Sequence, residues 1–161
     1  MNGHPHGQWV IALSFFCSFL LAVIPLPGEI TLWRPEWCGL VLVYWCVALP
    51  ERVGITTGWV VGLLQDVLSD TLLGRHALAL CLIAYLSVKF HRQIRVFTLW
   101  QQAMSVGGVI AIGKFLEVWS QSLVSYPHVQ WDFIYPALTS VLLWPWLSIV
   151  LRDMQRTYRV S

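Results

Sequence analysis

The sequence predicts an all-α, polytopic membrane protein with six transmembrane helices. Of its 161 residues, 57% are hydrophobic and only 11% are charged, whereas charged residues make up about a quarter of a typical soluble domain. The hydrophobic residues fall into six runs that are joined by short connections. The basic residues gather in alternate connections, as they do in proteins that cross a membrane several times.

We expect one transmembrane domain over residues 1–161. Its spans are predicted at about 8–24, 36–50, 53–69, 75–91, 98–122 and 132–151, close to the span length of about 17 to 25 residues. The second and third runs are short, and only "PERVG" separates them. A re-entrant segment in place of one of these two spans is therefore an open alternative. No polar stretch is long enough to form a separate soluble domain.

The basic residues predict the orientation. With six spans, the two termini and the second and fourth connections lie on the same side, which holds seven basic residues: Arg52, Lys89, Arg92, Arg95, Arg152, Arg156 and Arg159. The opposite side holds two, Arg34 and Arg75. Because basic residues favour cytoplasmic connections, we expect both termini in the cytoplasm.

Several function classes are disfavoured by the sequence. The net charge is only +2 and no basic run is present, which argues against nucleic-acid binding. The chain lacks G-x-S-x-G, H-E-x-x-H and glycine-rich phosphate-loop patterns, and its four cysteines form no C-x-x-C pair. His4 and His6 alone are weak evidence for a metal. We therefore expect no catalytic residue, no metal and no cofactor.

Small residues form a stripe along the third predicted helix. Gly54, Gly58 and Gly62 recur every four residues, and the same step reaches Asp66, Asp70 and Gly74. Four residues turn a helix by about 400°, so these positions stay near one face. Because apolar helices in lipid associate through close backbone contact, the stripe predicts a packing surface. It packs either inside the chain or against another subunit, which includes a possible homodimer.

Asp66 is expected to be held away from lipid, because a charge at the bilayer centre costs about 3 kcal/mol. Arg75 or the start of the fourth helix is its expected partner, and Asp70 and Thr71 are typical turn and capping residues. The contact either pins this turn or forms a proton or ion site. An intramembrane hydrolase would need a second carboxylate beside Asp66 and is a more distant alternative.

Lys114 and Glu117 are the other charged residues inside a predicted span. They are three residues apart in the fifth helix, so their side chains share a face and are predicted to form an ion pair.

The sequence resembles the MreD family of bacterial rod shape-determining membrane proteins from about Trp9 to Arg152. The resemblance is carried by "RPEW" at 34–37, "YWCVALPERVG" at 44–54, "GLLQDVLSDTLLGRHAL" at 62–78, "LWQQA" at 99–103 and "LWPW" at 143–146. Asp70 departs from the family pattern, because members of the family often have a glycine at this position.

The resemblance implies a non-enzymatic inner-membrane component of the cell-elongation (Rod) complex. It implies a fold like that of the six-helix substrate-binding subunit of energy-coupling-factor importers. The implied partner is the single-span protein MreC, and through it a SEDS glycosyltransferase, a class B penicillin-binding protein, RodZ and MreB. The implied role is to support lateral peptidoglycan synthesis and rod shape.

Recognition is expected mainly between helices, because little of the chain lies outside the bilayer. The outer-face turns are expected to contribute through Arg34, Pro35, Trp37, Asp70 and Arg75, and the cytoplasmic arginines favour anionic membrane lipid. The alternative function is a small-molecule binding or transport subunit of the importer type. It requires an outward-open pocket lined by Asp66, Arg75, Lys114 and Glu117.

Overall fold

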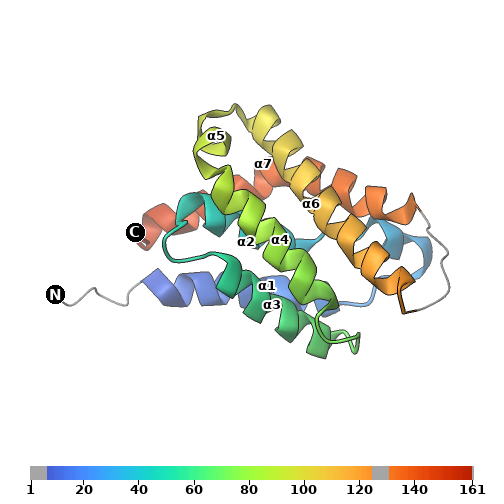
Figure 1. The fold of residues 1–161 in the computed structure, drawn as a ribbon. Coiled ribbons are helices and arrows are strands. Elements are labelled where there is room, and N and C mark those ends of the chain that lie inside the picture. The colour runs from blue at the N-terminus through green and yellow to red at the C-terminus, as the bar shows by residue number, and fades with distance from the viewer. Residues whose placement is uncertain (1–6, 125–130, 161) are drawn as a thin grey trace.

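The computed structural model describes residues 7–124 and 131–160. These residues are helical without strands, and helix makes up 82% of the structure. The α-helices are α1 (Gln8–Val23), α2 (Trp37–Ala48), α3 (Ile55–Leu68), α4 (Arg75–Lys89), α5 (His91–Val96), α6 (Leu99–Ser122) and α7 (Ile134–Thr157), with 3₁₀ turns η2 (Gly28–Trp33) and η3 (Trp131–Phe133). Figure 1 shows α6 and α7 side by side, with α1 and α3 on the other flank of the bundle.

Six of these helices lie in the six predicted hydrophobic segments. The differences are local. The predicted connection around residues 91–96 contains the short helix α5, and α7 continues through Pro145 to Thr157, six residues past the predicted end at 151. His128 lies outside the described residues, as do His4 and His6.

The helices differ in their capacity to cross a bilayer. α6 and the segment Trp131–Thr157 are long and apolar enough to span one, whereas α1 and α3 are apolar but shorter. The twelve residues of α2 extend about 18 Å, against a hydrocarbon core of about 30 Å. Six spans therefore remain a prediction.

The core forms around α2. Nine of its twelve residues are buried, and it contacts α1, α4, α5, α6 and α7. Trp45 of α2 is fully buried in this core. Its indole Nε1 donates a 2.8 Å hydrogen bond to Ser14 Oγ on α1. The surrounding helices therefore shield α2 from lipid.

Glycines allow neighbouring helices to approach closely. A Cβ atom on Gly107 of α6 would lie 2.1 Å from Val141 of α7, and one on Gly113 would lie 2.5 Å from Ile83 of α4. Such crossings supply the dispersion contacts that hold helices together in lipid.

Candidate functional site

The turn between α3 and α4 is organised around the carboxylate of Asp66, which is completely buried. It accepts backbone hydrogen bonds from Gly74 at 2.8 Å and from His76 at 2.9 Å, and a side-chain bond from Thr71 at 3.1 Å. These donors include backbone N–H groups that the first turn of α4 leaves without intrahelical partners. Asp66 therefore fastens the start of α4 to the end of α3.

His76 extends this contact into the centre of the bundle. Its Nδ1 atom lies 2.7 Å from Asp66 Oδ1, and its Nε2 atom lies 4.0 Å from Glu117 Oε1 on α6. An ionised carboxylate only accepts hydrogen bonds, so Nδ1 is the donor to Asp66. The imidazole thus lies between two carboxylates from different helices.

Lys114 links two further carboxylates. Its Nζ atom lies 3.0 Å from Glu117 Oε2, and it also forms an ion pair with Glu36, the residue just before α2. Glu36 in turn accepts a 3.2 Å hydrogen bond from Gln65 Nε2 on α3. We call the six residues Glu36, Gln65, Asp66, His76, Lys114 and Glu117 the buried polar network. It joins α2, α3, α4 and α6 near one end of the bundle.

A small cavity of about 210 Å³ reaches this network. Glu36, Gln65, His76 and Lys114 line it, whereas Asp66 and Glu117 do not. Gln65 Oε1 is buried and has no hydrogen-bond partner among the described residues. The cavity therefore offers acceptor and donor groups, but it gathers only Lys114 of the four residues expected to line an outward-open pocket.

The turn residues from "RPEW" surround the same cavity. Arg34, Pro35 and Trp37 line it. The guanidinium of Arg34 also donates to the last carbonyl groups of α1, at 3.2 Å to Leu21 and 2.8 Å to Ile24. A cation at a helix C-terminus is favourable because it opposes the helix dipole.

The other expected turn residues lie elsewhere. Asp70 and Arg75 line a separate groove with Gly74 and the end of α6. Arg75 forms no ion pair with Asp66, whose partners come instead from the backbone and side chains at the start of α4. Asp70 and Gly74 both have positive φ, at 50° and 101°. Asp adopts this left-handed region more readily than most residues, and glycine adopts it without a steric penalty.

The glycine stripe lies mainly against α4 of the same chain. A Cβ atom on Gly62 would lie 2.3 Å from Ala77 Cα, and one on Gly58 would lie 2.8 Å from the Leu80 carbonyl oxygen. Gly54, by contrast, has no such neighbour within 4 Å. Gly58 and Gly62 are therefore covered by α4, which makes its most extensive helix contact with α3.

Sequence reasoning missed three members of the buried polar network. The sequence predicts Glu36 only as part of the "RPEW" turn, and it predicts no contact for the side chains of Gln65 and His76. The signal is position. Glu36 and His76 stand at the starts of α2 and α4, and Gln65 lies near the end of α3, so all three lie on the same side of the bundle as Asp66.

In chemical terms, the network pairs each carboxylate with a donor or a cation. Among the described residues, no group of three or more His, Cys, Asp and Glu side chains is arranged to hold a metal ion. Asp66 and Asp70 form no dyad, because Asp66 is buried in the turn and Asp70 is exposed. The arrangement is suited to fixing helices against one another.

Comparison with known proteins supplies the family. A model described as rod shape-determining protein MreD matches residues 4–154. The rod shape-determining protein MreD of Haemophilus influenzae is 32% identical over 154 residues, which cover 95% of this chain and 95% of that protein. No solved structure matches the chain, so the likeness to an importer subunit stays a prediction. Because both matches extend over nearly all of its length, the chain belongs to the MreD family of rod shape-determining proteins.

Proposed function

We propose that this protein is a non-catalytic scaffold of the bacterial Rod complex, which binds MreC in the inner membrane and supports lateral peptidoglycan synthesis. The observation that carries the proposal is the match to a rod shape-determining protein over 95% of both chains. Because the match extends over nearly the whole chain, we assign the proposed role to the helical bundle as a whole.

We further propose six membrane spans with both termini in the cytoplasm. The placement of the arginines supports this orientation. Arg95 and Arg152 lie together at one end of the bundle, and Arg34 lies beside the buried polar network at the other. The network then lies toward the periplasmic side.

The buried polar network supports a binding role because each of its carboxylates has a cation or a hydrogen-bond donor beside it. Buried ion pairs that also receive hydrogen bonds fix helices in one arrangement more than they add stability. Here the pairs connect α2, α3, α4 and α6, which gives a partner protein a rigid surface.

We place the MreC span in the groove between α1 and α3. Its volume is about 610 Å³ and its lining is entirely apolar, with Phe16 and Leu20 from α1 and Leu64 and Val67 from α3. The α4 face of α3 is already filled at Gly58 and Gly62, whereas α1 and α3 contact each other little. An apolar single-span helix is the partner chemistry that this groove fits. A second copy of the chain is the competing occupant.

Co-purification with MreC from membranes tests this proposal. Leu64→Trp fills the groove, and Leu142→Trp makes the same change on α7, where the side chain is 73% exposed and outside the groove. We expect Leu64→Trp to lower MreC recovery about tenfold, the effect of losing about 1.4 kcal/mol at a central contact. The Leu142→Trp variant should recover MreC as the unsubstituted protein does. Equal recovery by both variants would reject the groove, and no recovery of MreC by the unsubstituted protein would reject the scaffold role.

One observation favours a second candidate function, small-molecule binding. Gln65 lines the cavity beside Glu36 and Lys114, and its Oε1 atom has no hydrogen-bond partner among the described residues. A buried acceptor without a partner costs about 1–3 kcal/mol. Uptake of a solute by liposomes that contain only this protein would establish that function and would argue against the scaffold.

A further inference from the structure

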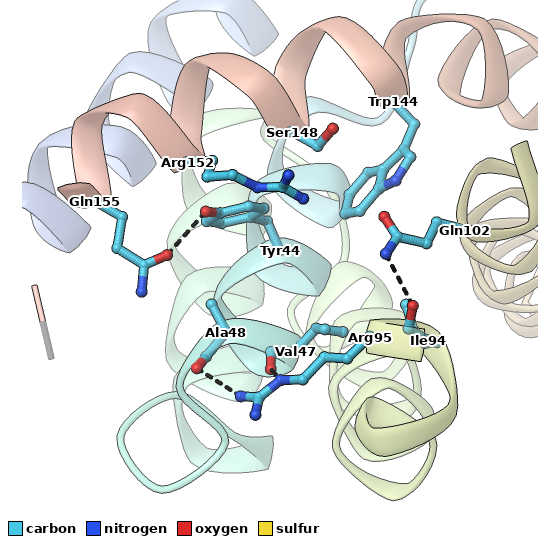
Figure 2. A pocket seen from close by; sticks show the side chains of 10 residues that line it. All are labelled: Tyr44, Val47, Ala48, Ile94, Arg95, Gln102, Trp144, Ser148, Arg152 and Gln155. Carbon is cyan, nitrogen blue, oxygen red and sulfur yellow. Dashed lines mark hydrogen bonds between the residues drawn. The ribbon is translucent and has the colours of Figure 1, made fainter. Parts of the chain in front are cut away.

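We infer that a pocket at the arginine-rich end of the bundle binds the phosphate group of an anionic phospholipid. The pocket lies between the end of α2, the short helix α5, the start of α6 and the second half of α7 (Figure 2). Its volume is about 330 Å³. It is at the opposite end of the bundle from the buried polar network, and the proposed orientation places it at the cytoplasmic leaflet.

The lining is cationic. Arg95 from α5 and Arg152 from α7 both line the pocket, and no carboxylate does. Figure 2 shows the two side chains entering from different sides, with Tyr44 between them. Two guanidinium groups without a lining carboxylate create a positive potential that favours an anion.

The two arginines differ in how they are held. Arg95 donates from Nε to the Val47 carbonyl at 2.8 Å and from Nη2 to the Ala48 carbonyl at 2.7 Å, which fixes it at the C-terminal end of α2. A guanidinium carries five N–H donors, so three remain for a ligand. Among the described residues, Arg152 forms no hydrogen bond or ion pair, so all of its donors are available.

A buried donor at the inner side of the pocket is the second, independent observation. Trp144 is only 2% exposed, and its Nε1 atom has no hydrogen-bond partner within residues 7–124 and 131–160. Figure 2 shows its indole nitrogen on the side of the ring that faces Gln102, within the circle of lining side chains. A buried N–H group without an acceptor is costly. A ligand that brings oxygen acceptors would satisfy it.

Several neighbouring donors are already engaged, which leaves the two arginines and Trp144 as the donors for a ligand. Tyr44 donates its hydroxyl hydrogen to Gln155 Oε1 at 2.9 Å, and Gln102 Nε2 donates to the Ile94 carbonyl at 2.9 Å. Phosphate oxygens match the paired donors of arginine better than any neutral group does. Basic pockets between helices on the cytoplasmic side of a membrane are typical binding places for anionic headgroups.

Native mass spectrometry of the purified full chain, without MreC, tests this inference separately from the scaffold role. The probe is phosphatidylglycerol, with phosphatidylcholine as the zwitterionic control and oleate as an anion that lacks phosphate. We expect phosphatidylglycerol to be retained more tightly than either of the other two.

Substitutions locate the binding. Arg152→Gln should weaken phosphatidylglycerol binding about fivefold, the effect of losing one basic contact near the surface. Arg156→Gln removes the same charge one turn further along α7, outside the pocket, and should change binding less than about twofold because only the diffuse field is reduced. Trp144→Phe keeps an aromatic ring without the donor and should also weaken binding.

Three results would overturn the inference. Equal losses from Arg152→Gln and Arg156→Gln would show a diffuse surface attraction without a site. Equal retention of oleate would remove the preference for phosphate. Displacement of phosphatidylglycerol by millimolar inorganic phosphate or glycerol 3-phosphate would assign the pocket to a free phosphate compound and reject the lipid.

Discussion

Gly62 of α3 and Ala77 of α4 are in backbone contact: a Cβ atom on Gly62 would lie 2.3 Å from Ala77 Cα and 2.6 Å from its nitrogen. The neighbour is backbone, so it cannot rotate away as a side chain would. Together with the contact between Gly58 and the Leu80 carbonyl, this contact sets how closely the two helices pack, and through α4 it sets where His76 meets Asp66.

Gly62→Ala should therefore destabilise the protein despite the higher helix propensity of alanine. Overpacking of this kind costs about 1–3 kcal/mol, against a gain of about 1 kcal/mol from propensity. Thermal unfolding in detergent, followed by size-exclusion chromatography, measures the effect. The control is Gly108→Ala in α6, where a Cβ atom meets nothing within 4 Å. That variant should be as stable as the unsubstituted protein or more so, and the same midpoint for both variants would contradict the proposed contact.

Asp66→Asn should destabilise the turn between α3 and α4. The carboxylate accepts hydrogen bonds on both oxygens, from Gly74 on Oδ2 and from His76 on Oδ1. An amide has one acceptor and one donor, so one backbone N–H group would face an NH₂ group, at a cost of about 1–3 kcal/mol.

Asp70→Asn is the matched control for that substitution. Asp70 is exposed and has φ of 50°, a region that asparagine also adopts. Limited proteolysis of the turn should accelerate for Asp66→Asn alone. Equal cleavage of the two variants would show that Asp66 does not hold the turn.

Lys114→Met should destabilise the bundle more than Gly62→Ala or Asp66→Asn does. It removes the cation between Glu36 and Glu117, and breaking a buried ion pair costs about 3–5 kcal/mol because a charge is left unpaired. Adding Glu36→Gln to Lys114→Met removes one of the two uncompensated charges. The double variant should unfold at a higher temperature than Lys114→Met alone. No recovery would mean that Glu36 and Lys114 are not coupled.

Labelling of single cysteines tests the proposed orientation. In a background without the four native cysteines, Leu72→Cys lies in the exposed turn between α3 and α4, and Glu51→Cys lies in the exposed turn between α2 and α3. With both termini in the cytoplasm, a membrane-impermeant maleimide should label Leu72→Cys in spheroplasts. Glu51→Cys should react only after the membrane is permeabilised. The reverse pattern would invert the orientation.

The positions of the six longer helices follow from hydrophobicity alone, because five of the six hydrophobic runs end beside a proline or a charged residue and the run over 98–122 ends in "SQS". α5 does not, because "HRQIRV" is polar at most positions and its single buried residue, Ile94, gives no periodic signal. Its helix depends on contacts with α2 and α6 that the local sequence does not encode.

The candidate site was predictable only where its residues are close in sequence. Lys114 and Glu117 share one helix face at a spacing of three residues, so their proximity follows from helix geometry. Glu36 reaches Lys114 only because α2 and α6 pack together. The alternative that Arg75 pairs with Asp66 was reasonable from charge. Backbone donors at the start of α4 occupy that carboxylate instead, because they are available without the entropic cost of ordering an arginine side chain.

The central claim is that this protein determines cell shape through binding. It is tested most directly by cell width in a rod-shaped bacterium that has been depleted of its own MreD and expresses this chain together with its cognate MreC. We predict that rod shape is restored by the unsubstituted chain and by Leu142→Trp, and that cells expressing Leu64→Trp become round. Round cells with the unsubstituted chain present in the inner membrane at normal abundance would contradict the account.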